Sequence, residues 1–144
     1  MLQSLKRDVE TGDEAESLSS TLQMALSVRL RIFAVEKIKP AADEFLVEFS
    51  QRLDQVRARR HAVDFEAAKA RAWWKGPRTT ELVDMGRRAL ATDPEIQRLK
   101  AADGIEPIVF DRYAGEALQQ LVRERFADIE LQMASLRDNR LNVQ

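Results

Sequence analysis

The stretch TLQMALSVRLRIFAVEKIKP, from Thr21 to Pro40, decides the fold because its apolar residues fit two kinds of secondary structure. Large apolar side chains occupy every second position from residue 22 to residue 32, and a period of two is typical of a half-buried strand. The same stretch is rich in good helix formers, and no Gly or Pro interrupts it between Asp13 and Pro40. We therefore favour a helix for this ambiguous segment, residues 21–38, with a strand as the alternative.

Both interpretations predict that this segment contacts another copy of the chain. A helix would carry apolar residues on two opposed sides, which indicates a central place in a bundle or a contact between subunits. A strand would need a partner for its backbone groups, either across a dimer axis or with the short run IEPIVF at residues 105–110. The self-association residues are Leu22, Met24, Leu26, Val28, Leu30 and Ile32, and in a helix Val35 continues the side of Met24, Val28 and Ile32.

Helical patterns dominate the rest of the chain, so we predict an all-α bundle. Two long helices are expected at about 41–75 and 111–140. In the first, apolar residues step by three and four from Leu46 to Trp74, which forms a heptad seam broken only at Arg60. Two short helices are expected between the long ones, at about 79–90 and 94–103.

Proline and glycine set the expected ends of these helices. Pro40 is expected at the first turn of the first long helix, and Gly76-Pro77 is expected to end it. Asp93-Pro94 has the pattern of a helix cap followed by a first-turn proline, and the helix that it opens is expected to stop near Gly104.

Length and composition indicate one globular domain. The chain has 144 residues, of which 44% are apolar and 33% charged, so we expect a single helical domain at 17–144 after a flexible arm at 1–16. There is no cysteine to form a disulfide or ligate zinc. The charged N-terminus lacks the apolar run of a signal peptide, so a cytoplasmic location is expected. The 17 Arg against six Lys suggest a bacterial or phage source.

Positive charge is concentrated in one window, residues 57–78, with seven basic and two acidic side chains. The segments on either side each carry a net charge of −3, so the whole chain has a net charge of −1. In a helix, several of these basic residues would share one side, with two tryptophans at its end, and such a surface could bind nucleic acid through charge and stacking. The candidate binding residues are Arg57, Arg60, Arg71, Trp73, Trp74, Lys75 and Arg78.

Each feature of this window also has a structural interpretation. Trp74 continues the apolar seam and fits a core position, while Arg57 and Arg71 fit ion pairs with neighbouring acidic helices. Arg60 could meet an acid on a facing helix, such as Glu124, Asp128 or Glu130, or the seam could turn to solvent there.

Enzymatic patterns are weak. His61, the only histidine, has Asp64 one helical turn away, but two such residues do not complete a metal or catalytic site. No Gly-rich phosphate loop occurs, and the apolar stripes have the spacing of helix packing rather than of a membrane-binding face. We therefore predict a non-enzymatic protein without cofactor, metal or small-molecule substrate. It is expected to act through protein–protein interaction, in an adaptor, assembly or inhibitor role, and to self-associate as a homodimer. Nucleic-acid binding is the alternative.

Overall fold

A computed structural model describes residues 18–142, and within this range the chain is helical with short connections and no strand. The predicted arm at 1–16 lies outside the described residues. The first helical rod comprises α3 (Ser20–Phe33), the π-helical turn η1 (Ala34–Ile38) and α4 (Lys39–Val56). The prediction of an all-α fold and the helical interpretation of residues 21–38 are therefore confirmed.

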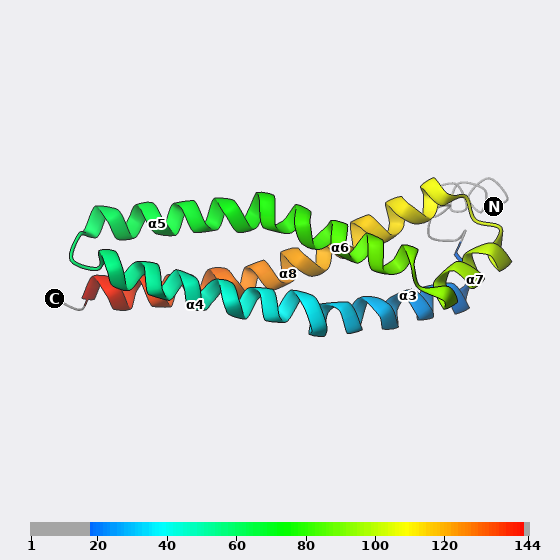
Figure 1. The fold of residues 1–144 in the computed structure, drawn as a ribbon, viewed down its shortest axis with the longest axis horizontal. Coiled ribbons are helices and arrows are strands. Elements are labelled where there is room, and N and C mark those ends of the chain that lie inside the picture. The colour runs from blue at the N-terminus through cyan, green and yellow to red at the C-terminus, as the bar shows by residue number, and fades with distance from the viewer. Residues whose placement is uncertain (1–17, 143–144) are drawn as a thin grey trace, which may run out of the picture.

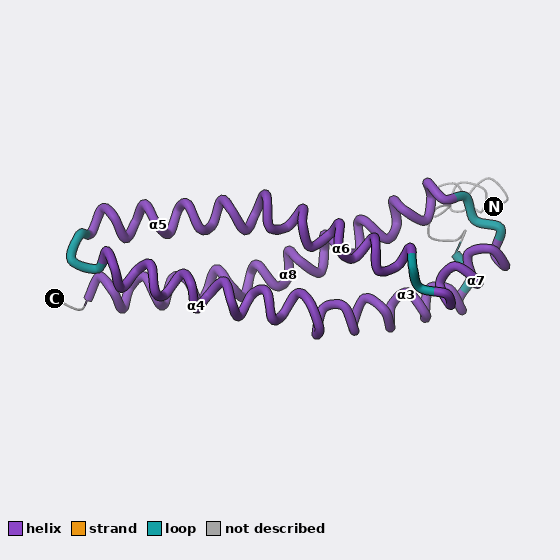
Figure 2. The backbone as a smooth tube through the Cα atoms, in the orientation of Figure 1, coloured by secondary structure: helices purple, strands orange, loops and turns teal. Residues whose placement is uncertain are grey.

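Three long rods form an elongated bundle. The second rod comprises α5 (Arg60–Trp73), the π-helical turn η2 (Trp74–Arg78) and α6 (Thr79–Ala91). A short helix, α7 (Pro94–Asp103), leads into the third rod, α8 (Pro107–Asn142). The first two rods run antiparallel, α8 lies against both, and α7 packs on α3 at one end (Figure 1). The connections lie mainly toward the two ends of the bundle (Figure 2).

Each of the first two rods passes a proline by means of a π-helical turn. Proline has no backbone N–H, and its ring clashes with the carbonyl four residues earlier in a regular α-helix. Just before Pro40, the Lys39 N–H donates to the Ala34 carbonyl, five residues back. In η2, which contains Pro77, the hydroxyl of Thr79 donates to the Trp74 carbonyl over 2.6 Å. The wider turns let both helices continue past their prolines.

The predicted helix over 41–75 is therefore wrong in its bounds. Pro40 lies in the first turn of α4, as predicted, but α4 follows η1 without a break, and the second rod continues through η2 past Gly76-Pro77 into α6. The predicted helix is also not continuous, since the chain reverses at 57–59, where the Arg59 N–H donates to the Val56 carbonyl over 2.8 Å. The predicted helix over 79–90 continues α5 rather than standing alone, and α8 begins four residues before the predicted 111.

The seam is nevertheless buried, because the hairpin folds its two halves toward each other and toward α8. In this half of the bundle the fully buried residues include Phe49, Leu53, Val63, Ile129 and Met133. At the other end, α3, α6, α7 and α8 bury Leu22, Leu26, Leu82, Ile96 and Leu118. Within 18–142, none of the helices combines the length and the apolarity needed to cross a lipid bilayer.

Ion pairs connect α8 to both arms of the hairpin. Arg125 and Arg140 of α8 reach the α4 carboxylates Asp43 and Asp54, respectively. Towards α5, Glu130 accepts from Arg71 over 2.8 Å, and Arg137 lies 2.9 Å from Asp64. Two of these pairs reach α4 and two reach α5, so together they favour one rotation of α8 about its axis, although each exposed pair contributes only about 0–1 kcal/mol.

Two contacts hold α7 against α3, and both predicted ends of α7 are confirmed. The Asp93 carboxylate accepts from the Ile96 N–H over 3.1 Å, as an N-cap does, and also from Arg29 of α3 over 2.5 Å. Gly104 ends the helix in the left-handed conformation, at φ 62°. The Asp103 carboxylate accepts from the Ser19 N–H at the start of α3 over 2.7 Å.

Replacing Asp93 with alanine should lower the free energy of unfolding by about 1–2 kcal/mol at neutral pH, because the cap and the ion pair are both lost. The hydrogen bond from the Ile96 N–H, and secondarily Arg29, hold the pKa of Asp93 below its usual 3.8. A group with a lowered folded pKa contributes stability that is present above the unfolded pKa and is lost as pH falls through the folded pKa. The difference between wild type and Asp93→Ala should therefore shrink as the pH falls below 3.8, as measured by urea unfolding.

Asp93→Asn is the matched control, since asparagine keeps the cap and removes the charge. We expect it to cost less than Asp93→Ala and to show little dependence on pH in this range. Equal losses for the two variants would show that the cap does not stabilise α7.

Candidate interaction surfaces

The first candidate surface is the outer side of α3 and η1. Of the six residues predicted for self-association, Leu22 and Leu26 are core residues and Leu30 packs against the core. The others are exposed: Met24 to 70%, Val28 to 46% and Ile32 to 44%, and Val35 joins them at 64%. The prediction of two opposed apolar sides is correct for the helix, and within the described chain only one side is covered. We call Met24, Val28, Ile32 and Val35 the outer stripe.

The outer stripe lies within an arc of about 80° around the helix axis. At about 100° per residue, Val28 is rotated by about 40° from Met24 around the helix axis, and Ile32 by about 40° more. Val35 falls between Met24 and Val28. At about 1.5 Å per residue, the stripe extends about 16 Å along the helix. This is roughly three turns of one helix, the length over which a partner helix makes contact.

A shallow groove adjoins the stripe at Ile32. It encloses about 240 Å³ between α3 and α6, and its apolar lining includes Ile32, Phe33, Met85 and Ala89. The ion pair of Arg29 and Asp93 lies at its edge. The stripe and this groove together offer a partner an apolar strip next to an apolar hollow.

The residues of the predicted basic surface are spread along the second rod and the turn before it, and two of them are ion-paired. Arg57 lies in the turn after α4, and Arg60 is exposed at the start of α5, where the seam turns to solvent rather than meeting an acid of α8. Arg71 and Arg78 lie about 16 and 27 Å farther along the rod by helical rise. Arg71 pairs with Glu130, and Arg78 donates to Glu81 over 2.8 Å. Lys75 is exposed in η2.

The two tryptophans of the window have different environments. Trp74 is fully buried, in agreement with its seam position, and its indole N–H has no acceptor among the described residues. Trp73 is 39% exposed because adjacent helical residues point about 100° apart. The Arg78 guanidinium lies 5.7 Å from the centre of the Trp73 ring. Nucleic-acid binding by this window stays a prediction.

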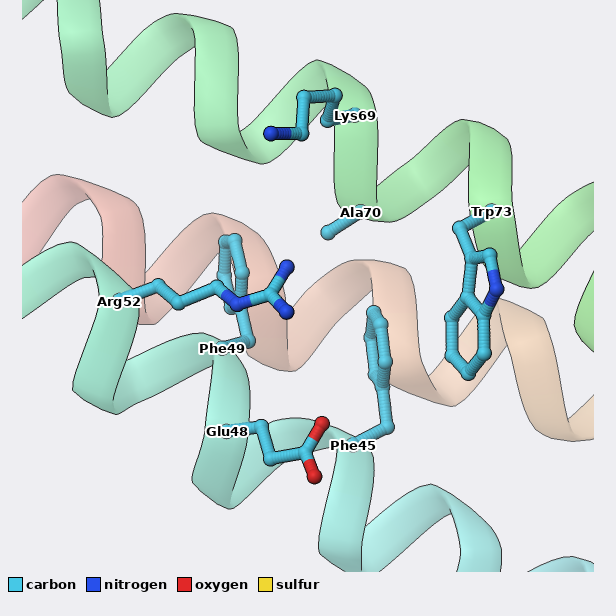
Figure 3. Close-up of a pocket in the computed structure, with 7 residues that line it drawn as sticks. All are labelled: Phe45, Glu48, Phe49, Arg52, Lys69, Ala70 and Trp73. Atoms are coloured by element: carbon cyan, nitrogen blue, oxygen red, sulfur yellow. The ribbon is translucent and has the colours of Figure 1, made fainter.

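A second candidate surface is a groove between α4 and α5, which the sequence alone does not indicate. It encloses about 340 Å³ and is lined by Phe45, Glu48, Phe49, Arg52, Lys69, Ala70 and Trp73 (Figure 3). We call it the aromatic groove. Trp73 lies more than 20 positions from Phe45 and Phe49 in the sequence, and only the unpredicted turn at 57–59 brings it next to them. No local pattern could have identified it.

The residues considered for chemistry do not form a catalytic group. His61 is exposed at the start of α5, and the carboxylate of Asp64 pairs with Arg137 of α8. Across residues 18–142, no three His, Asp or Glu side chains gather as metal ligands would.

Comparison of the chain with protein-family models, with curated proteins and with solved structures gave no match.

Proposed function

We propose that this protein acts without chemistry of its own, through protein–protein interaction, and that it self-associates through the outer stripe of α3 and η1. The exposure of four large apolar side chains on one side of one helix carries this proposal. Fully burying such a side chain is worth about 1.5–3 kcal/mol, so covering four from each partner is a substantial driving force. Some of this is offset by the entropy lost on association.

The spacing of the stripe supports a second copy of the chain as the partner. The intervals between its residues are four, four and three, which is nearly the same sequence of intervals in either direction. In an antiparallel pair related by a two-fold axis, Met24 would lie opposite Val35 of the other copy, and Val28 opposite Ile32. A two-fold contact requires such a self-complementary surface.

The test is the mass of the protein in solution. Size-exclusion chromatography with light scattering should give twice the 16.5 kDa chain mass for wild type. Val28→Asp should give the monomer mass, with a dissociation constant raised by about 100-fold or more, because the carboxylate would be buried without a partner.

Leu131→Asp is the matched control, since Leu131 is 75% exposed on α8, away from the stripe. It should keep the wild-type mass, and circular dichroism should show both variants fully helical. A wild-type protein that stays monomeric up to millimolar concentration, or a dimer that survives Val28→Asp, would disprove self-association through the stripe.

A further inference from the structure

The aromatic groove between α4 and α5 has an apolar end and a cationic end, which is an arrangement suited to an amphipathic small molecule. The apolar end is formed by three rings. The Phe45 ring is stacked with Phe49 at 6.2 Å and an interplanar angle of 4°, and with Trp73 at 5.9 Å and 20°. Phe45 and Phe49 are almost wholly buried, so Trp73 offers the open aromatic surface.

Trp73 is held in place before any ligand arrives. Burial of Trp74 in the core fixes the rotation of the helix and directs Trp73 outward, toward the groove. One neighbour of Trp73 is Phe45, and another is the Arg78 guanidinium, which is itself held by Glu81. A side chain fixed in this way loses little conformational entropy on binding.

The small Ala70 side chain leaves the space in front of these rings open. Ala70 lines the groove opposite Phe45 and Phe49, and a larger residue at this position of α5 would fill it (Figure 3). The enclosed volume of about 340 Å³ lies within the range of small-molecule sites, which begins at about 300 Å³.

The other end of the groove is flanked by cations from both helices. Arg52 of α4 makes no ion pair with any residue in the described range 18–142. Lys69 of α5 lies 3.6 Å from Glu66 and over the exposed ring of Phe65. Both cations also line the shallower hollow that continues the groove. Among the described residues, Glu48 is the only acid that lines the aromatic groove itself, and Glu66 lines the adjoining hollow.

We propose that the aromatic groove binds a small aromatic anion, such as an aryl carboxylate, independently of the outer stripe. The ring of the ligand packs against the open surface of Trp73, and its carboxylate lies between Arg52 and Lys69. Aromatic packing contributes affinity, and the charge-assisted contacts set the orientation. Glu48 disfavours the ligand by repelling its negative charge.

The experiment is a titration of the full chain with 2-naphthoate, followed by two-dimensional amide NMR at low salt. The two indole N–H signals provide an internal comparison. As 2-naphthoate is added, the Trp73 signal should shift until the site is saturated, and the signal of the buried Trp74 should shift much less. Backbone amides of Phe49 and Ala70 should shift with the same dissociation constant. The uncharged 2-naphthamide should bind about fivefold or more weakly.

Three charge variants of exposed residues test the orientation. Arg52→Gln should raise the dissociation constant about 5- to 10-fold, and Glu48→Gln should lower it about twofold. Arg88→Gln, on the exposed side of α6, is the matched control and should leave it unchanged. The proposal is overturned if no saturable shift occurs up to the solubility limit of 2-naphthoate, if the shifts lie away from the groove, or if Arg52→Gln binds like Arg88→Gln.

Discussion

Trp74→Ala is expected to lower the free energy of unfolding by about 3–5 kcal/mol, the range for removing a large aromatic from a packed core. Trp74 is the largest fully buried side chain of the protein in the described range. It packs against Phe45 of α4, with ring centres 5.0 Å apart, and it lies in η2, which also contacts α8. The cavity would therefore open where all three rods meet. Urea unfolding followed by circular dichroism measures the loss.

Trp73→Ala is the matched control, with the same chemical change one position earlier. Because Trp73 is half-exposed, we expect a loss of no more than about 1.5 kcal/mol, chiefly from its ring contact with Phe45. Equal losses of unfolding free energy in the two variants would contradict the finding that Trp74 is buried and Trp73 is partly exposed.

Gly86→Ala is expected to lower the free energy of unfolding by about 1–3 kcal/mol through overpacking. A Cβ atom at Gly86 would lie 2.5 Å from one methyl carbon of Leu118 and 2.9 Å from the other. Leu118 is fully buried on α8, so relieving this overlap would require its side chain or the two helices to shift. The close approach of α6 and α8 therefore requires glycine, even though alanine has a higher helix propensity by about 1 kcal/mol.

Gly76→Ala gives the comparison for this effect, because nothing lies within 4 Å of a Cβ atom at Gly76. Alanine there should leave stability unchanged or raise it by up to about 1 kcal/mol. Thermal unfolding of both variants tests whether their changes in stability have opposite signs. A Gly86→Ala protein as stable as Gly76→Ala would show that α6 and α8 can separate without cost.

Local signals predicted the secondary structure well where one residue type controls the backbone. Asp93-Pro94 opens α7 and Gly104 closes it, because an acceptor at the cap, a fixed φ and a left-handed residue each act within one turn. Residues 21–38 are helical, as their content of good helix formers predicts, although their apolar residues repeat with a period of two. The alternation had a simpler origin, since one of its two sets of residues packs in the core and the other is exposed.

The topology could not be predicted from the same signals. The seam from Leu46 to Trp74 fits one long helix and a hairpin equally well, because the residues on both sides of the turn keep the same spacing in either arrangement. The turn itself is Arg57-Ala58-Arg59, which contains none of the residues typical of turns. The aromatic groove depends on this turn, so it could not be inferred without it. An ion pair between Arg71 and a neighbouring acidic helix was predicted, but its partner Glu130 was not assigned to it.

The two π turns also explain why neither proline interrupts its helical rod. In an uninterrupted α-helix, the buried side of α3 would continue through positions 37, 40, 44 and 48, all of which are exposed. The buried positions are 38, 41, 45 and 49, each one residue later, and after η2 they are 82 and 86 rather than 81 and 85. Both rods therefore have the pattern of a regular amphipathic helix into which a single residue has been inserted. A chain shortened by one residue in either turn, with its proline replaced, would keep the downstream side chains facing the directions that they face now.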